Sequence, residues 1–311
     1  MPDAVTHCYV ASDVKDALSI PYLTNHFNLM QIGAQGPDPL FYHHYQPWKK
    51  NLHATKLGSR LHREKTKPYL EAIIKAASND EDKAWVSGFL THFALDTSAH
   101  PYIFYRTGLY DKKTQENRGY HLMLERTIDH INIRERGFNP MTYNIRDHHF
   151  SVKTIPSSIT IMLNEVGKSL YNEPELGFRY TEGYYDFRSA IGILAYDPRG
   201  VKKFFYRILD RLTRSEILYS ALSPYRCEAE GSDHKNTLKN TWYHPVTNEP
   251  SNESFDEMVE RAKNKSIMLI QAAHTFWESG DMEVFTLIND ESYDTGMATG
   301  KHKMVHFEIM Y

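Results

Sequence analysis

Apolar residues recur at intervals of three and four along most of the chain, which is the spacing of a helix with one buried face. Runs of alternating apolar and polar residues between hairpin turn signals, which would predict strands, do not stand out in the sequence. The helical spacing predicts helices at residues 13–34 (with a break at Pro21), 55–77, 83–100, 119–136, 157–171, 181–195, 200–221 and 254–279. We therefore expect an all-α fold.

Several predicted helices carry end signals. The acidic stretch NDED at 79–82 offers capping side chains for the helix that follows it. Pro101 is expected to end that helix, because proline disfavours helical backbone at the preceding residue. Gly137 is expected to end the next predicted helix, and Ser254 with Glu257 has the spacing of a capping box at the start of the last one.

The chain has 311 residues, enough for one large domain or two small ones. No shift in composition marks a flexible linker, so we predict a single domain over residues 1–311. Its functional half is expected at about 1–140, and the remainder, about 141–311, is expected to be helical packing. Residues 228–253 are polar and contain two prolines, which predicts a long surface loop.

Composition excludes several classes of protein. The formal net charge of -3 gives no basic excess, so no extended nucleic-acid surface is expected. No stretch approaches about 18 uninterrupted apolar residues, so no transmembrane segment is predicted. The N-terminus lacks a basic start followed by an apolar core, so no signal peptide is predicted and a cytoplasmic location is expected. Cys8 and Cys227 are the only cysteines, which excludes a disulfide framework.

The apolar segment GFLTHFALDTSAHPY (88–102) places His92, Asp96 and His100 at every fourth position. In a helix, residues four apart differ by roughly 40° around the axis and roughly 6 Å along it, so these side chains share one stripe. The two imidazoles are then roughly 12 Å apart along the axis, too far to share one ion easily at a zinc–nitrogen distance of about 2.0–2.1 Å. The spacing predicts a multinuclear metal site, with His92 and Asp96 on one ion and His100 on another.

Other segments supply ligands of the same types. His121 and Glu125 form a second pair four residues apart, and with His100 they make a His, His, carboxylate set of the kind known for catalytic zinc. His62, in KLGSRLHREK, is a candidate to complete the ion at His92 and Asp96.

Asp38 and His7 are further candidates. Asp38 lies in GAQGPDPLF, where a glycine and two prolines predict a rigid turn after a helix. Its carboxylate is suited to bind metal or to accept a proton from a nucleophilic water. His7 is a candidate ligand for a third ion.

Each candidate also has an ordinary structural interpretation. A single histidine is usually a surface or hydrogen-bonded residue, and a His–acid pair four apart often only stabilises a helix. A di-iron bundle would use Glu and His three residues apart, a spacing that the His–acid pairs here do not have. The whole set is therefore more informative than any of its members.

Five segments in sequence order resemble the zinc-dependent phospholipase C family: HCYVAS with His7, GAQGPD with Asp38, GSRLH with His62, HFALDTSAHPY, and HLMLE with Glu125. That family shares an all-helical trinuclear-zinc fold with single-strand-specific nucleases, so the resemblance implies such a core here. The stretch TWYHPVTNEPSNESFDEM at 241–258 resembles a segment of the family's intracellular bacterial branch.

The resemblance implies a role for each candidate. His62, His92 and Asp96 would hold one zinc, with Asp96 bridging to another, and His100, His121 and Glu125 would hold the second. His7, Asp96 and the free N-terminus would hold the third, and Asp38 would be the general base or an additional ligand. Secreted members use an N-terminal tryptophan at the third zinc, whereas this chain begins Met1-Pro2. We therefore expect about two to three Zn²⁺ per chain.

The function implied is that of a zinc-dependent phosphoric diester hydrolase, similar to phospholipase C, in which an activated water attacks phosphorus. A phosphoester small molecule or a phospholipid is the expected substrate. Two alternatives remain open. One is a nuclease or nucleotide phosphodiesterase that uses the same metals, and the other is a non-catalytic, metal-stabilised helical binding protein.

Overall fold

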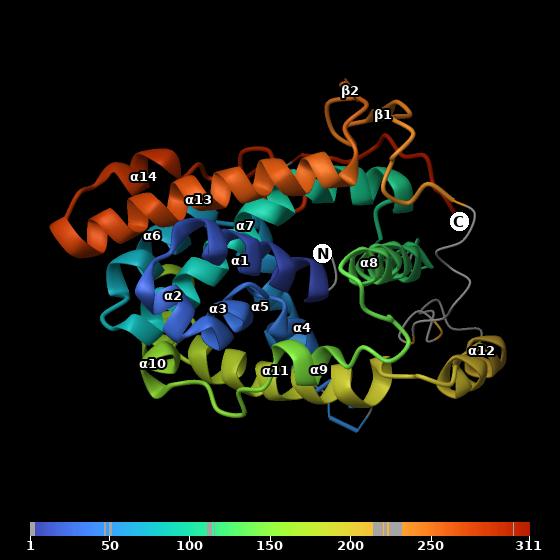
Figure 1. Cartoon of the computed structure of the whole chain (residues 1–311), viewed down its shortest axis with the longest axis horizontal. Coiled ribbons are helices and arrows are strands. Elements are labelled where there is room, and N and C mark those ends of the chain that lie inside the picture. The colour runs from blue at the N-terminus through green and yellow to red at the C-terminus, as the bar shows by residue number, and fades with distance from the viewer. Residues whose placement is uncertain are drawn as a thin grey trace.

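The computed structural model describes residues 4–46, 48–49, 52–110, 114, 116–213, 220, 223, 232–300 and 302–311. Within these residues nearly all regular structure is helical, which confirms the all-α prediction (Figure 1). The elements are α1 (Ala4–Leu18), α2 (Pro21–Asn25), α3 (Phe27–Gly33), α4 (Pro39–Tyr42), α5 (Leu52–Arg63), α6 (Thr66–Ala76), α7 (Asp80–Thr107), α8 (Glu116–Glu135), α9 (Ile145–His149), α10 (Ser157–Tyr171), α11 (Leu176–Ala190), the π-helical turn η1 (Ile191–Ala195), α12 (Val201–Thr213), β1 (Trp242–Tyr243), β2 (Pro250–Ser251), α13 (Phe255–Ser279) and α14 (Glu283–Leu287).

Helix α7 is the central element. It spans 28 residues, is buried along most of its length, and packs against α3 and α13 (Figure 1). Gly88 permits the close contact with α3, because a Cβ there would stand 2.0 Å from the carbonyl oxygen of Met30. A helix buried on several sides has no wide polar face, so its few polar residues must find partners inside the protein.

The prediction that Pro101 ends this helix is wrong. Helix α7 continues through Pro101 to Thr107, and Gly108, at φ 78°, follows its last residue. Pro101 has no N–H to bond with the carbonyl of Thr97, and the backbone of Gly296 packs against that carbonyl. Tyr102 and Ile103 are buried, so tertiary packing outweighs the local preference of the proline.

Other helix boundaries also differ from the periodic pattern. The first helix begins at Ala4 rather than at residue 13, which places His7 on a helix. The predicted helix at 55–77 is divided by Lys65, which adopts a left-handed conformation with φ 55°. The predicted helix at 200–221 is described as far as Thr213, and its next six residues lie outside the described part of the chain.

The capping signals were more reliable. The side chain of Asn79 accepts a hydrogen bond from the N–H of Asp82 at the start of α7. Ser254 and Glu257 form the predicted capping box at the start of α13. Within the predicted loop at 228–253, the described residues include a short antiparallel pairing of β1 with β2.

One buried apolar cluster includes residues from α1 to the segment after α14. Tyr293, in that last segment, is buried, and its N–H donates to the carbonyl of His62 on α5. The C-terminal part of the chain therefore contacts an element that carries a predicted ligand, in addition to packing on the core. Among the described residues, no helix has the length and apolar character needed to cross a membrane.

Candidate metal centre

The structure gathers the predicted ligands from five parts of the chain in one buried region. They are His7 on α1, Asp38 in the turn before α4, His62 on α5, His92, Asp96 and His100 on α7, and His121 and Glu125 on α8. Every one of these residues is at most 6% exposed.

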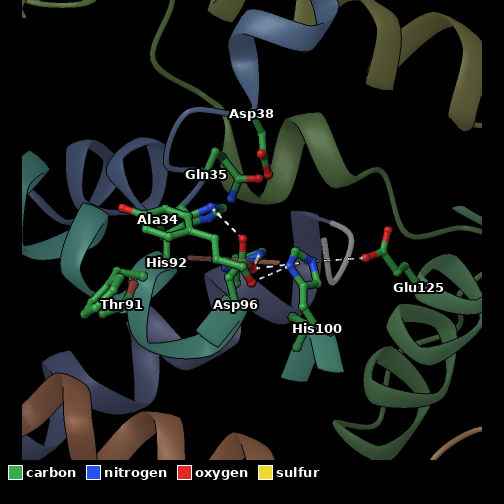
Figure 2. A network of polar contacts seen from close by, with 12 residues as sticks. Ala34, Gln35, Asp38, Thr91, His92, Asp96, His100 and Glu125 are labelled. Carbon is green, nitrogen blue, oxygen red and sulfur yellow. Dashed lines mark hydrogen bonds and ion pairs between the residues drawn. The ribbon is translucent and has the colours of Figure 1, made fainter. Parts of the chain in front are cut away.

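Asp96 lies at the middle of this region (Figure 2). Its Oδ2 is 3.0 Å from Nε2 of His92 and 3.9 Å from Nε2 of His62. Its Oδ1 is 3.4 Å from Nε2 of His7 and 3.8 Å from Nε2 of His100. The two oxygens therefore face different sets of imidazoles, as a carboxylate shared between ions would.

The ligand atoms form three buried groups, each with its members within 4.8 Å of one another: His7, His92 and Asp96; Asp38, His62 and His92; and His100, His121 and Glu125. Ligand atoms held about 2.1 Å from one tetrahedral ion lie about 3.4 Å apart, so each group needs only small adjustments to enclose an ion. Among the described residues, no such group contains both His92 and His100. The structure thus separates these two histidines as the helical spacing predicted.

Asp38 enters the region on the turn predicted from GAQGPDPLF. Its Oδ1 lies 3.2 Å from Nε2 of His62. Gly36, at φ 50°, brings the turn against His92, where a Cβ would stand 2.1 Å from the imidazole Cδ2. Only glycine fits both the backbone conformation and the contact, which gives the glycine of this motif a physical reason.

Backbone carbonyls fix the orientation of three imidazoles. Nδ1 of His62 donates to the carbonyl of Gly58 at 2.8 Å, Nδ1 of His92 to that of Ala34 at 3.1 Å, and Nδ1 of His100 to that of Tyr293 at 2.9 Å. A proton on Nδ1 leaves the lone pair of Nε2 directed toward the carboxylates. This is the arrangement by which metal-bound histidines are usually held.

Within the described part of the chain, several buried polar atoms in this region have no hydrogen-bond partner. They are both ring nitrogens of His7, Nε2 of His62, His92 and His100, both carboxylate oxygens of Asp96, and Oδ1 of Asp38. Each such atom ordinarily costs about 1–3 kcal/mol, and here they point at one another rather than at scattered places in the core. Bound cations would satisfy the whole set at once, so the residues present fit a zinc cluster.

The charges are arranged to suit metal ligands. Burial lowers the pKa of His7, His100 and His121, which favours the neutral imidazoles that bind zinc. Burial opposes ionisation of Asp96, but His100 and His92 hold its pKa well below the usual range. The central carboxylate therefore stays negative in spite of its burial.

His92 and Glu125 shift in the opposite direction. Burial disfavours the charged form of His92, yet the carboxylates of Asp96 and Asp38 raise its pKa above the ordinary value. Burial raises the pKa of Glu125. Bound cations would reverse both shifts, because they favour a neutral imidazole and an ionised carboxylate.

Asp129 continues the stripe of His121 and Glu125 on α8, and it supports the centre through α1 rather than through an imidazole. Its carboxylate accepts hydrogen bonds from the N–H groups of Val5 and Thr6 at 2.9 and 2.8 Å, and from the hydroxyl of Thr6. It therefore caps the first turn of α1 and fixes the helix that carries His7. The only signal in the sequence is its place one turn beyond Glu125 on the same helix.

Tyr293 and Asp294 also support the centre. The ring of Tyr293 packs against those of His62 and His92, at centroid distances of 5.3 and 5.7 Å. Asp294 pairs with Arg63, one residue after His62, and Arg63 lowers the pKa of its carboxyl in spite of burial. No pattern in the sequence marks these residues, because a backbone carbonyl and a packed ring are available from many residue types.

The predicted contribution of the N-terminus to a third zinc lies outside the described residues, which begin at Ala4. The ligands predicted for the other two ions, together with His7, all lie within the described part of the chain.

Comparison with known proteins identifies the family. Residues 6–168, more than half of the chain, match the family described as zinc dependent phospholipase C. No curated protein and no solved structure matches. The matched region contains every residue of the three buried groups, from His7 to Glu125. The chain belongs to the zinc-dependent phospholipase C family.

Proposed function

We propose that this protein hydrolyses phosphodiesters of the phospholipase C type, using about two to three Zn²⁺ held by the three buried groups. The observation that carries the proposal is the convergence of buried imidazole and carboxylate atoms that have no hydrogen-bond partner among the described residues. Family membership supports zinc-dependent hydrolysis of the phospholipase C type. The phosphodiester substrate is part of the proposal.

Two of the groups share His92, whose Nε2 can bind only one ion, so His92 is assigned to one of them. Asp38, His62 and His92 would hold the first, and His100, His121 and Glu125 the second. A third would lie at His7 and Asp96, with Asp96 shared between ions through its two oxygens. When bound, zinc supplies a water with a pKa near about 7 and balances negative charge on the phosphoryl oxygens.

The protein residues position the reactants. Asp38, on its rigid turn, has one of two roles: it binds the first ion, or it orients the attacking water and accepts its proton. The carbonyls of Gly58, Ala34 and Tyr293 keep three imidazoles in place, so the ligands need little rearrangement during the reaction. Water would attack phosphorus in line with the departing alcohol, and no covalent enzyme intermediate is required.

The test is hydrolysis of a soluble chromogenic substrate, p-nitrophenylphosphorylcholine, by the full chain after removal and restoration of zinc. We expect activity to vanish with chelation, to return with zinc, and to fall at least about a hundredfold in Asp38→Asn. The matched control is Asp186→Asn, which alters a carboxylate that binds the N–H of His44 outside the three buried groups.

Parallel assays with single-stranded DNA and with phosphatidylcholine assign the substrate class. Hydrolysis of DNA in preference to both choline phosphodiesters would replace the proposal with the nuclease alternative. If the protein binds stoichiometric zinc but hydrolyses none of these phosphodiesters, the remaining alternative is a non-catalytic, metal-stabilised binding protein.

A further inference from the structure

Helix α12 is amphipathic, but its apolar face is exposed and its polar face is turned inward, the reverse of a helix that packs on a core. Its apolar residues are exposed: Val201, Phe204, Phe205, Ile208, Leu209 and Leu212. Phe204 and Phe205 are 62% and 60% exposed and Leu212 is 77% exposed, whereas Lys203 is 2% exposed. At 100° per residue the apolar side chains span about 140° of the circumference, and Lys203 lies roughly opposite the middle of that face. The polar face is therefore turned inward and the apolar face outward.

A buried polar network fixes this orientation. The N–H of Lys203 donates to Oδ2 of Asp197 at 2.8 Å, and the hydroxyl of Ser223 donates to the same oxygen at 2.8 Å. The ammonium of Lys203 donates to the carbonyl of Ser223 at 3.1 Å. Asp197 and Ser223 are themselves buried. Rotating α12 to bury its phenylalanines would break this network and strand a buried charge, so the exposed apolar face is built into the fold.

The other highly exposed apolar residues of α10 and α11 do not form such a face. Ile161 on α10 and Phe178 on α11 are 56% and 59% exposed, but among the described residues neither helix carries a run of six exposed apolar side chains as α12 does. Isolated exposed apolar residues are common on soluble proteins, whereas a continuous exposed stripe marks an interaction surface.

The charge of α12 indicates what the apolar face meets. The helix carries four basic residues, Lys202, Lys203, Arg207 and Arg211, and one acidic residue, Asp210. Lys203 is buried, and the ammonium of Lys202 donates to the carbonyls of Ile193 and Tyr196. The basic border of the apolar face is therefore formed by Arg207 and Arg211, which follow one another along one side of it. Aromatic and aliphatic residues with basic flanks are the composition of helices that lie in the interface of an anionic bilayer. A second protein would need an acidic groove of matching shape to receive the same surface.

Helix α12 also lies toward the α8 side of the metal centre. Figure 1 shows α12 and α8 at the same end of the molecule. On the inner side of α12, burial raises the pKa of Tyr206, and the positive charge of Arg126 on α8 opposes that shift. Arg126 directly follows Glu125, a member of the third buried group.

We propose that α12 docks this protein onto the surface of a bilayer that contains anionic phospholipids. Val201, Phe204, Phe205, Ile208 and Leu212 enter the interface, and Arg211 meets the lipid phosphates. Docking brings the α8 end of the molecule toward the membrane. The further consequence, that membrane phospholipid is the substrate, rests on the proposed function.

The test is co-sedimentation of the zinc-free full chain with phosphatidylcholine vesicles, with and without phosphatidylglycerol. The variant is Phe204→Ser/Phe205→Ser, and the matched control is Ile161→Ser/Phe178→Ser, which removes two equally exposed apolar side chains elsewhere. We expect binding that requires phosphatidylglycerol, is retained by the control, and falls at least about tenfold in the α12 variant. We also expect Arg211→Glu to weaken binding to anionic vesicles.

Three results would overturn the proposal: no binding to anionic vesicles, equal binding of the two double variants, or a dimer that only the α12 variant abolishes, which would make this face a contact between copies. Because the assay uses zinc-free protein, its outcome does not depend on catalysis. Hydrolysis of soluble p-nitrophenylphosphorylcholine by the zinc-loaded α12 variant, expected to be unchanged, tests the proposed function separately.

Discussion

Helices α7 and α12 both depart from the usual distribution of side chains, but in opposite directions. Helix α7 buries a carboxylate and two imidazoles among apolar residues, whereas α12 buries a lysine and exposes two phenylalanines. The buried polar atoms of α7 face ligand atoms on other elements, while the apolar side chains of α12 face outward. We propose that bound ions satisfy the buried polar atoms of α7, and that an external surface covers the exposed apolar side chains of α12.

The largest effect is expected from Asp96→Asn, which keeps the size of the central side chain but removes its charge and one ligand oxygen. Because Asp96 contacts imidazoles through both oxygens, we expect the loss of more than one zinc and a fall in activity of at least about a hundredfold. Elemental mass spectrometry and hydrolysis of the soluble phosphodiester measure the two. Unchanged zinc content would mean that Asp96 is only a packing residue.

Replacing one phenylalanine by alanine in each helix tests, through the free energy of unfolding, whether α7 is buried and the apolar face of α12 is exposed. Phe89 on α7 is 1% exposed and Phe204 on α12 is 62% exposed. In zinc-free protein we expect Phe89→Ala to lower the free energy of unfolding by about 3–5 kcal/mol, and Phe204→Ala to change it by less than about 0.5 kcal/mol. Urea unfolding measures both. A large loss for Phe204→Ala would show that its ring is buried in solution.

His149 is a buried histidine whose two ring nitrogens both have partners, so it serves as a contrast to the metal centre. Nδ1 lies 2.7 Å from Nε2 of Gln31, and Nε2 lies 2.7 Å from the hydroxyl of Tyr143. Burial lowers the pKa of His149 from 6.5 to about 4. Between these two pH values the unfolded chain binds the proton and the folded chain does not, so stability falls as the pH falls.

The expected loss is about 3 kcal/mol between neutral pH and about pH 4, in zinc-free protein. His149→Gln should flatten this part of the pH dependence, whereas His148→Gln, at the exposed neighbouring position, should leave it in place. Urea unfolding across the pH range measures the slope. An identical slope in all three proteins would show that His149 does not stay neutral when folded.

A smaller effect is expected from Asp129→Ala. The substitution leaves two N–H groups at the start of α1 without their acceptor, so we expect a loss of about 1–2 kcal/mol in unfolding free energy and weaker zinc binding at His7. Asp13→Ala, which removes an exposed carboxylate from the same helix, should stay within about 0.5 kcal/mol. Equal effects of the two substitutions would contradict the capping role.

The candidate ligands could be picked out from the sequence because metal chemistry restricts residue type and the helix restricts spacing. Few side chains can bind zinc, so His92, Asp96 and His100 stood out from an apolar segment. Their supporting contacts were not predictable, since the carbonyl of Tyr293 could belong to any residue and lies 193 positions away from His100.

Local sequence signals gave wrong or incomplete predictions where tertiary burial determines the structure. Pro101 lies inside α7 because the residues around it are packed on several sides, which the sequence around Pro101 does not reveal. Periodicity predicted that α12 is helical, but periodicity alone does not tell whether the apolar face is buried or exposed. Only the contacts of Lys203 with Ser223 and Asp197 show which face is turned inward.

We propose that the stripe of His92, Asp96 and His100 on α7 holds parts of two separate zinc sites. Its most direct test is the metal content of the purified full chain, by elemental mass spectrometry, beside His92→Ala and His100→Ala, with His149→Ala as a buried control outside the centre. We expect about two to three zinc ions per chain, with roughly one lost in each α7 variant and none in the control. No zinc after gentle purification, with both α7 variants folded and unchanged, would contradict it.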